Sequence, residues 1–181
     1  MNQISTPAIR LCVICVVCAF LLGICSEVTK EPIAAQTIKT QQEAMAAVLP
    51  DCTYEDIKDA KLSDNVTAVA KATDNSGNAA GFVVSCEVSS FGGPLDMMVG
   101  VDPNGTITGL RVLSHSDTPG LGARSTEPEF YGQFNGMSGT LAVDKDGGQV
   151  KAITSATITS RAVTSGANAA LQWVSENGGA Y

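Results

Sequence analysis

Five hydroxyl side chains occur in one short stretch of this chain, ITSATITSRAV at residues 153–163, and this grouping could bind an anion. They fall within seven consecutive positions, at Thr154, Ser155, Thr157, Thr159 and Ser160. Serine and threonine are poor residues inside a helix but good ones at its start, where their oxygens bind free N–H groups. Apolar residues with helical spacing continue from Ile158 to Val174, so the hydroxyls lie where a strand passes into a helix.

The start of a helix attracts phosphate through its free N–H groups and its dipole. An ordinary cap needs one Ser or Thr, and five exceed that need, so we interpret residues 154–160 as an anion site. The stretch is not a P-loop, because no G-K-[ST] sequence is present. The alternative, in which the hydroxyls only cap the helix, stays open.

The only histidine, His115, begins a second stretch, HSDTPGLGAR at residues 115–124. A histidine beside Asp117 and several serines suggests a hydrolase, but the G-x-S-x-G sequence of such enzymes is absent. One histidine without a suitable cysteine cluster also argues against a zinc site. We therefore expect neither a catalytic triad nor a metal site here.

The centre of this second stretch, TPGLG, suits close contact with a flat ligand. Gly120 and Gly122 allow the backbone to approach such a ligand, and Leu121 offers an apolar contact. The alternative is a rigid turn, since Pro119 fixes φ and the glycines permit tight geometry.

Apolar segments bounded by turn residues predict an antiparallel sheet. The expected strands lie at residues 66–72, 79–90, 95–102 and 106–116, with a further hairpin at 140–154 around DKDGG. A short helix is expected near Glu127–Phe134 and a longer one from Ile158 to about Ser175. About six antiparallel strands and three helices outside the membrane indicate an α+β fold rather than a βαβ fold.

The N-terminal segment predicts a membrane anchor. Residues 11–26 carry no charge, and neighbouring apolar residues lengthen the segment if Arg10 extends to the headgroups. A cleaved signal peptide fits the length, but no A-x-A site follows. A lipoprotein would use Cys25, but the bulky Ile24 precedes it. We interpret the segment as a retained anchor.

The chain is acidic, with 11 basic and 18 acidic residues and a formal net charge of -7, which argues against nucleic-acid binding. All acidic residues follow position 26, where the basic ones number 10, so the remainder carries 10 minus 18, or -8. The positive-inside rule then keeps Arg10 in the cytoplasm and places the body outside.

Pro32 suits the first turn of a connecting helix and Pro50 its end. The expected parts are a cytoplasmic stub and anchor at 1–26, a connecting helix at 27–50 and an extracytoplasmic body at 51–181.

The six cysteines do not predict a metal centre. Cys12, Cys15 and Cys18 have a CxxCxxC spacing, but within an apolar helix cysteine behaves as a small hydrophobe. Cys52 and Cys86 are the only cysteines of the body. Outside the membrane these two could form a disulfide, whereas reducing surroundings would leave them free, and both alternatives stay open.

Three segments follow the anchor and TKEPIAAQ, and in chain order they are HSDTPGLGAR, EPEFYGQF and AITSATITSRAV. In these segments the chain resembles the G subunit of the Rnf electron-transport complex. The domain is shared with the C subunit of the sodium-pumping NADH:quinone oxidoreductase. The resemblance implies an extracytoplasmic FMN joined by a phosphoester to the threonine of an S/T-G-A-T-x-T/S motif, which is Thr157 here. The resemblance also implies a flavin transferase that attaches the FMN, using FAD and magnesium. The implied FMN-binding residues are Thr157 with Thr154, Ser155, Ala156, Ile158, Thr159 and Ser160, and His115, Asp117, Thr118, Pro119, Gly120, Leu121 and Gly122.

The resemblance further implies an electron carrier, anchored by one span in the cell (inner) membrane. Its partners would be the other members of a complex that couples ferredoxin:NAD+ electron transfer to sodium or proton translocation. Two alternatives remain: an independent flavinylated domain of another reductase, and a non-catalytic anchored module. The sequence departs from the family pattern at Ser155, where Gly is usual, at Lys151, where an acidic residue is common, and at Asp117, where Glu is common.

Overall fold

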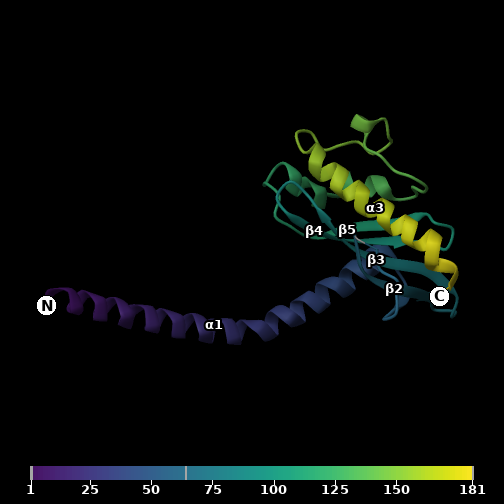
Figure 1. The fold of residues 1–181 in the computed structure, drawn as a ribbon. Helices are drawn as coiled ribbons and strands as arrows, with labels where there is room; N and C mark the ends of the chain where they lie inside the picture. Colours follow the sequence, from purple (N-terminus) through teal and green to yellow (C-terminus); the bar gives the residue numbers. More distant parts are fainter. Residues whose placement is uncertain (1, 64, 181) are drawn as a thin grey trace. The chain divides into compact units, whose positions relative to one another are not determined.

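The computed structural model describes residues 2–63 and 65–180, and the chain forms two compact units, residues 1–40 and 41–181. Helix α1 (Asn2–Val48) makes up the first unit and continues into the second (Figure 1). Its segment Ile9–Lys30 has 22 residues and is long and apolar enough to cross a membrane. The predicted anchor therefore coincides with a helix that fits a single membrane span.

The prediction that a separate helix begins at Pro32 is wrong, because α1 is continuous from Asn2 to Val48. A proline removes one backbone donor, yet the residues that follow it are rich in Ala, Gln, Lys and Glu, which are strong helix formers. They keep the chain helical beyond the proline. The expected end is confirmed, since α1 stops just before Pro50.

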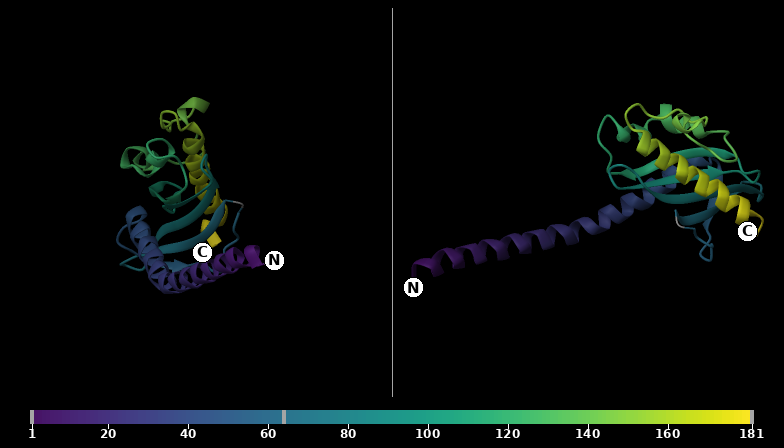
Figure 2. Two further views of the ribbon diagram at one scale, coloured as in Figure 1. Left: turned by 90° about the vertical axis from the view of Figure 1, so that its left-hand side faces the viewer. Right: turned by 45° about the horizontal axis from the view of Figure 1, so that its top comes forward.

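The second unit is built on a five-stranded antiparallel sheet in which neighbours along the chain are neighbours in the sheet. Its strands are β1 (Cys52–Asp56), β2 (Val66–Asp74), β3 (Ala79–Ser89), β4 (Pro94–Val101) and β5 (Ile107–His115). Helix α3 (Thr157–Asn177) lies across one face of the sheet (Figures 1 and 2). The predicted α+β class with an antiparallel sheet is confirmed.

Both faces of the sheet are covered, because alternate residues of the central strands enter two different apolar clusters. Val84 and Val99 belong to the cluster that includes α3, whereas Val83 and Met98 belong to a second cluster with Val48. Side chains of a strand alternate between its faces, so these clusters lie on opposite sides of the sheet.

The second cluster needs two facing glycines. Gly100 and Gly109 pair across β4 and β5, and a Cβ on Gly109 would lie 2.7 Å from the Cα of Val48. The hydroxyl of Thr108 donates to the carbonyl of Val48 at 2.7 Å. The absence of side chains on the glycine pair thus lets the last turn of α1 reach the sheet, where Thr108 satisfies one of its free carbonyls.

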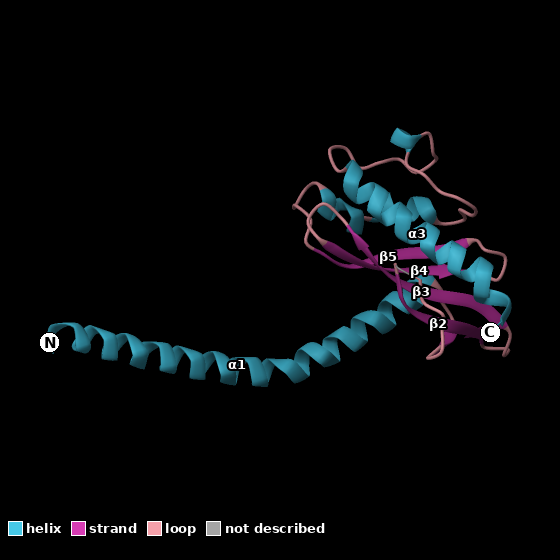
Figure 3. Cartoon of the chain, viewed as in Figure 1, coloured by secondary structure: helices cyan, strands magenta, loops and turns pink. Residues whose placement is uncertain are grey.

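Four predicted strands are confirmed, but the hairpin at 140–154 is wrong. Figure 3 shows this region as loops with one short 3-10 helix, Asp144–Asp146, and only an isolated bridge joins Val143 to Val150. Gly147, with φ 81°, ends that helical turn in the left-handed conformation. The short helix is confirmed as α2 (Pro128–Tyr131) and the 3-10 turn after it. Strand β1 escaped prediction because it is short, polar and largely exposed.

The structure decides between the alternatives for the two body cysteines. Cys86 lies in the α3-side cluster, while Cys52 packs against the cluster on the opposite face. All six thiols are free. Burial raises the pKa of Cys86 to about 12, and its thiol points to the carbonyl of Gly166 at 3.5 Å. Cys86 therefore behaves as an inert core residue.

We expect a maleimide to label Cys52 but not Cys86 in the folded chain, because only Cys52 is partly exposed and the Cys86 thiol is both buried and protonated. Peptide mass spectrometry after labelling distinguishes the two positions. In denaturant both should react. A peptide pair joined by a Cys52–Cys86 disulfide, from protein kept without reductant, would contradict the packing described.

Candidate functional site

The two stretches singled out in the sequence meet at one pocket of about 360 Å³ at the N-terminal end of α3. Its lining comes from three segments far apart in the chain: Phe91; Asp117, Thr118, Leu121 and Gly122; and Ser155, Ala156, Thr157, Ile158 and Thr159. The fold therefore brings together nine of the fourteen predicted site residues and adds Phe91.

Thr157 is the first residue of α3 and lies half-buried on the pocket wall. The chain reaches it through a tight turn in which Ser155 has φ 65° and the N–H of Ala156 donates to the carbonyl of Ile153 at 3.0 Å. Ala156 occupies the N-cap position, where no side chain makes a capping hydrogen bond. The first N–H groups of α3 are thus left for solvent or an anion beside the Thr157 hydroxyl.

The five hydroxyls of this stretch have different surroundings. Ser160 is fully buried, where its Oγ accepts the N–H of Ile153 at 2.9 Å and donates to the carbonyl of Ala156 at 3.0 Å. Thr159 is also buried, although it lines the pocket, whereas Thr154 and Ser155 are exposed. The crowding of hydroxyls that indicated an anion site is therefore partly structural, since Ser160 binds backbone groups of the turn itself.

Asp117 ties the second stretch to the turn between β3 and β4. Its Oδ1 accepts the hydroxyl of Ser90 at 2.5 Å and the N–H of Gly92 at 2.6 Å. The backbones are so close that a Cβ on Gly92 would lie 2.2 Å from the carbonyl oxygen of Ser116. A glycine at position 92 is thus required for the contact that holds Phe91 at the pocket.

The carboxyl of Asp117 is 6% exposed and stays charged. Burial alone would raise its pKa, but hydrogen bonds from Ser90, Gly92 and Thr159 and the nearby His115 hold the pKa below its ordinary value. The contribution of this carboxylate to stability is present at neutral pH and is lost as the pH falls through the lowered pKa. Its other oxygen, Oδ2, is buried without a hydrogen bond of good geometry, so the pocket wall carries a fixed negative charge.

Apolar side chains surround the pocket opening. Beyond residue 40, the described large apolar side chains that are exposed are Leu62, Phe91, Leu121 and Ile158, and all but Leu62 line this pocket. A concave site with mainly apolar walls and a few polar groups is typical of a small-molecule or cofactor site. Sequence reasoning missed Phe91, whose only signal is an aromatic residue in a glycine turn between two predicted strands.

Five predicted site residues do not line this pocket: His115, Pro119, Gly120, Thr154 and Ser160. His115 ends β5, and its Nδ1 accepts the N–H of Asp117 at 3.3 Å, so it orients the loop. Among the described residues, no group of three or more His, Cys, Asp or Glu side chains could hold a metal ion.

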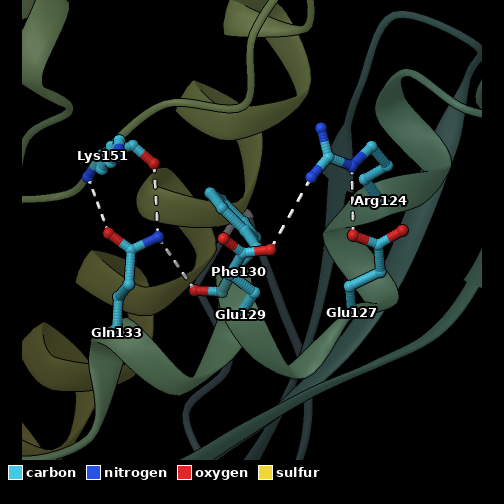
Figure 4. A network of polar contacts seen from close by, with 6 residues as sticks. All are labelled: Arg124, Glu127, Glu129, Phe130, Gln133 and Lys151. Carbon is cyan, nitrogen blue, oxygen red and sulfur yellow. Dashed lines mark hydrogen bonds and ion pairs between the residues drawn. The ribbon is translucent and has the colours of Figure 1, made fainter.

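A second, more polar pocket of about 330 Å³ is lined by the residues that lead into the turn, up to Thr154, and by the segment around α2. Figure 4 shows its contacts: Arg124 pairs with Glu127 at 3.1 Å and with Glu129 at 3.8 Å, while Gln133 binds the backbone of Lys151. These ion pairs are solvent-exposed and contribute little to stability.

Comparisons with known proteins identify both units. Residues 90–172 match the family model of an FMN-binding domain, and residues 1–48 match that of an RnfG N-terminal region. The G subunit of the ion-translocating oxidoreductase complex of Methanosarcina acetivorans is 35% identical over 98% of both chains. The G subunit of the proton-translocating ferredoxin:NAD(+) oxidoreductase complex of Clostridium ljungdahlii is 30% identical over 96% of this chain and 92% of that one. The solved structure of Shewanella oneidensis NqrC is 28% identical, with a TM-score of 0.48, over 71% of this chain and 65% of that one.

The backbone of Ser155 predicts which side chains position 155 tolerates. Its φ of 65° is unfavourable for residues with a Cβ by about 1–2 kcal/mol, and most unfavourable for β-branched ones. Serine already bears this cost, so we expect Ser155→Val, which adds β-branching, to lower the free energy of unfolding by about 1 kcal/mol. Ser155→Gly should raise it slightly, because the relief of strain is partly offset by the larger conformational entropy of glycine in the unfolded chain. Denaturant unfolding followed by the fluorescence of the single tryptophan measures both. Equal stabilities for the two variants would contradict the left-handed conformation.

Proposed function

This chain belongs to the family of G subunits of ion-translocating oxidoreductase complexes, and we propose that it carries FMN covalently on Thr157 as the electron carrier of such a complex. The observation that carries the proposal is the position of Thr157, at an uncapped helix start and on the wall of an apolar pocket. All residues that line the pocket lie inside the segment matched by the FMN-binding domain, 90–172.

The pocket fits FMN in size and chemistry. Its volume of about 360 Å³ is at the lower end of the range of about 300–1,000 Å³ for ligand sites, so it suits a ring system with the rest of the molecule nearer the surface. Phe91 and Leu121 offer apolar contacts to a flat ring. The free N–H groups at the start of α3 suit the phosphate end, whose remaining charge the helix dipole stabilises.

Attachment to Thr157 requires a second enzyme, because a threonine hydroxyl is not acidic enough to react unaided. In the proposed step, a flavin transferase uses FAD: Oγ1 of Thr157 bonds to the phosphorus on the flavin side of the pyrophosphate. The bond from that phosphorus to the bridging oxygen breaks, AMP leaves with the electron pair, and the hydroxyl proton passes to a base of the transferase. One FAD thus yields one FMN phosphoester and one AMP.

Bound FMN supplies one- and two-electron transfer, and the residues of the pocket set its surroundings. The covalent bond keeps the cofactor from being lost to the outside. Asp117 holds the Phe91 turn and places a negative charge on the wall, which disfavours further negative charge on the bound group. No substrate-binding acid or base is needed, because the task is the passage of electrons.

Membrane anchoring places this carrier beside the other subunits of the complex, where a high local concentration favours contact. The Clostridium ljungdahlii relative is named for a proton-translocating ferredoxin:NAD+ oxidoreductase complex, and the same kind of ion-coupled electron transfer is proposed for this chain. The asymmetry of charge, with Arg10 before the apolar segment and an acidic body behind it, supports an extracytoplasmic body.

Thr157→Ala should abolish covalent flavin, because it removes the only atom that can form the proposed phosphoester. The chain is produced together with a flavin transferase, and flavin fluorescence is read on a denaturing gel. Thr67→Ala is a matched control, since it removes an exposed threonine hydroxyl on β2 that donates to the carbonyl of Ser85. Fluorescence that persists in Thr157→Ala would place the bond on another residue.

Leu121→Ala should change the redox behaviour of the flavin without preventing its attachment. Leu121 lines the pocket and is 41% exposed, and a buried Leu side chain contributes about 1.5–3 kcal/mol, enough to loosen a ring that packs on it. The variant should stay fluorescent on a denaturing gel but show a shifted spectrum or midpoint potential when folded. Leu62→Ala, another exposed leucine away from this pocket, is the control. A wild-type spectrum and potential in Leu121→Ala would exclude this wall as the ring site.

The proposed orientation predicts that protease added to intact spheroplasts digests residues 51–181. Residues 1–8, before the apolar segment, should stay protected, because they lie inside. Immunoblots with antibodies to the body and to an N-terminal tag measure this. Full protection of the body until the cells are lysed would reverse the orientation.

A further inference from the structure

The segment that leads into the acceptor turn is held by side chains instead of a strand. The N–H of Lys151 donates to Oε1 of Gln133 at 2.9 Å. The next N–H, of Ala152, donates to Oδ1 of Asp144 at 3.2 Å, and that of Ile153 donates to Oγ of Ser160 at 2.9 Å. Three consecutive backbone donors are thus satisfied by side chains from three different elements.

Gln133 differs from the other two in binding both polar groups of one residue. Its Nε2 donates to the carbonyl of Lys151 at 3.3 Å while its Oε1 accepts the N–H of the same residue (Figure 4). The Nε2 also donates to the carbonyl of Phe130 at 3.3 Å. The side-chain amide therefore replaces the neighbouring strand that the sequence led us to expect for this segment.

The base of Gln133 is rigid. It lies in the 3-10 turn Gly132–Phe134, beside the fully buried Phe134, which packs edge-on against Phe130 at 5.8 Å between ring centroids. Of the segment that Gln133 holds, Ile153 and Ala156 are buried in the core. Lys151, Thr154 and Ser155 are exposed, and Ser155 also has an unfavourable φ.

We propose that Gln133 is a positioning residue for flavin attachment: by fixing the backbone of Lys151 it keeps the turn that presents Thr157 preformed for the transferase. The inference rests on the proposed function and goes beyond it, because it assigns a role to a residue outside the flavin pocket. Only five residues separate Lys151 from Thr157, so loss of the clamp lets the turn fluctuate. A transferase then meets the reactive arrangement less often.

The test uses the full chain in detergent, with FAD, magnesium and a purified flavin transferase. Gln133→Met keeps the length of the side chain but removes its hydrogen bonds, Gln133→Asn is too short to span both groups, and Gln133→Glu keeps only the acceptor for the Lys151 N–H. Gln172→Met is the matched control, since Gln172 is exposed on α3 and donates to Glu176 on the same helix. The readouts are kcat/KM for attachment, amide exchange at residues 151–157 and the unfolding midpoint.

We expect attachment to be about tenfold slower in Gln133→Met and Gln133→Asn, with Gln133→Glu between these and the wild type, as the loss of one or two hydrogen bonds implies. Exchange should accelerate at residues 151–157 only. Gln172→Met should match the wild type. If Gln133→Met does not unfold cooperatively, the attachment rate and amide exchange of Gln133→Glu test the proposal instead.

Two results would overturn the inference while leaving the proposed function intact: wild-type rates in the Gln133 variants, or slower attachment without faster exchange at residues 151–157. The second would mean that the transferase itself contacts Gln133. A wild-type chain that accepts no FMN from the active transferase would instead contradict the proposed function, and the inference with it.

Discussion

The packing of α3 across the sheet is the interaction on which the site depends. The helix and sheet approach so closely that a Cβ on Gly166 would lie 2.6 Å from Sδ of Met97. Nearer the C-terminal end of the helix, Trp173 is 2% exposed, packs edge-on against Phe82 at 5.7 Å and donates from Nε1 to the carbonyl of Lys61 at 2.9 Å. These contacts fix the rotation and the axial position of α3, and with them the place of Thr157 at its start.

Around this fixed helix start, polar groups have separate tasks. Ser160 and Asp117 are buried and bond to backbone groups, so they shape the turn and the pocket wall. Thr157 and the first N–H groups of α3 remain available for a phosphate. A buried polar residue that is hydrogen-bonded gives a defined geometry, whereas an open helix end gives binding capacity. The site combines the two within a few residues of sequence.

Much of this arrangement could be predicted from the sequence, and the exceptions have physical reasons. Apolar periodicity and turn residues predicted β2 to β5 and α3, because those elements bury their apolar faces. The same rules predicted a hairpin at 140–154, but there side chains such as Gln133 satisfy the backbone, and no local pattern reveals this. Phe91 was not predicted, because its position at the pocket depends on the hydrogen bond between the neighbouring Gly92 and Asp117, which is distant in the sequence. Which of the five hydroxyls are buried depends on the residue at which α3 begins and on the rotation of the helix about its axis. The spacing of residues in the sequence predicts neither of these.

If one hydroxyl of five near the start of α3 carries the flavin, tryptic cleavage can identify it, because it isolates all five in one peptide. Trypsin cuts after Lys151 and Arg161, which releases residues 152–161, AITSATITSR. Tandem mass spectrometry of this peptide, from protein of the native membrane, locates the flavin on a single residue. We expect fragment ions that contain Thr157 to carry the added mass of FMN less one water, and those that end before it to lack this mass. An unmodified peptide, or the added mass on Thr154, Ser155, Thr159 or Ser160, would contradict this expectation.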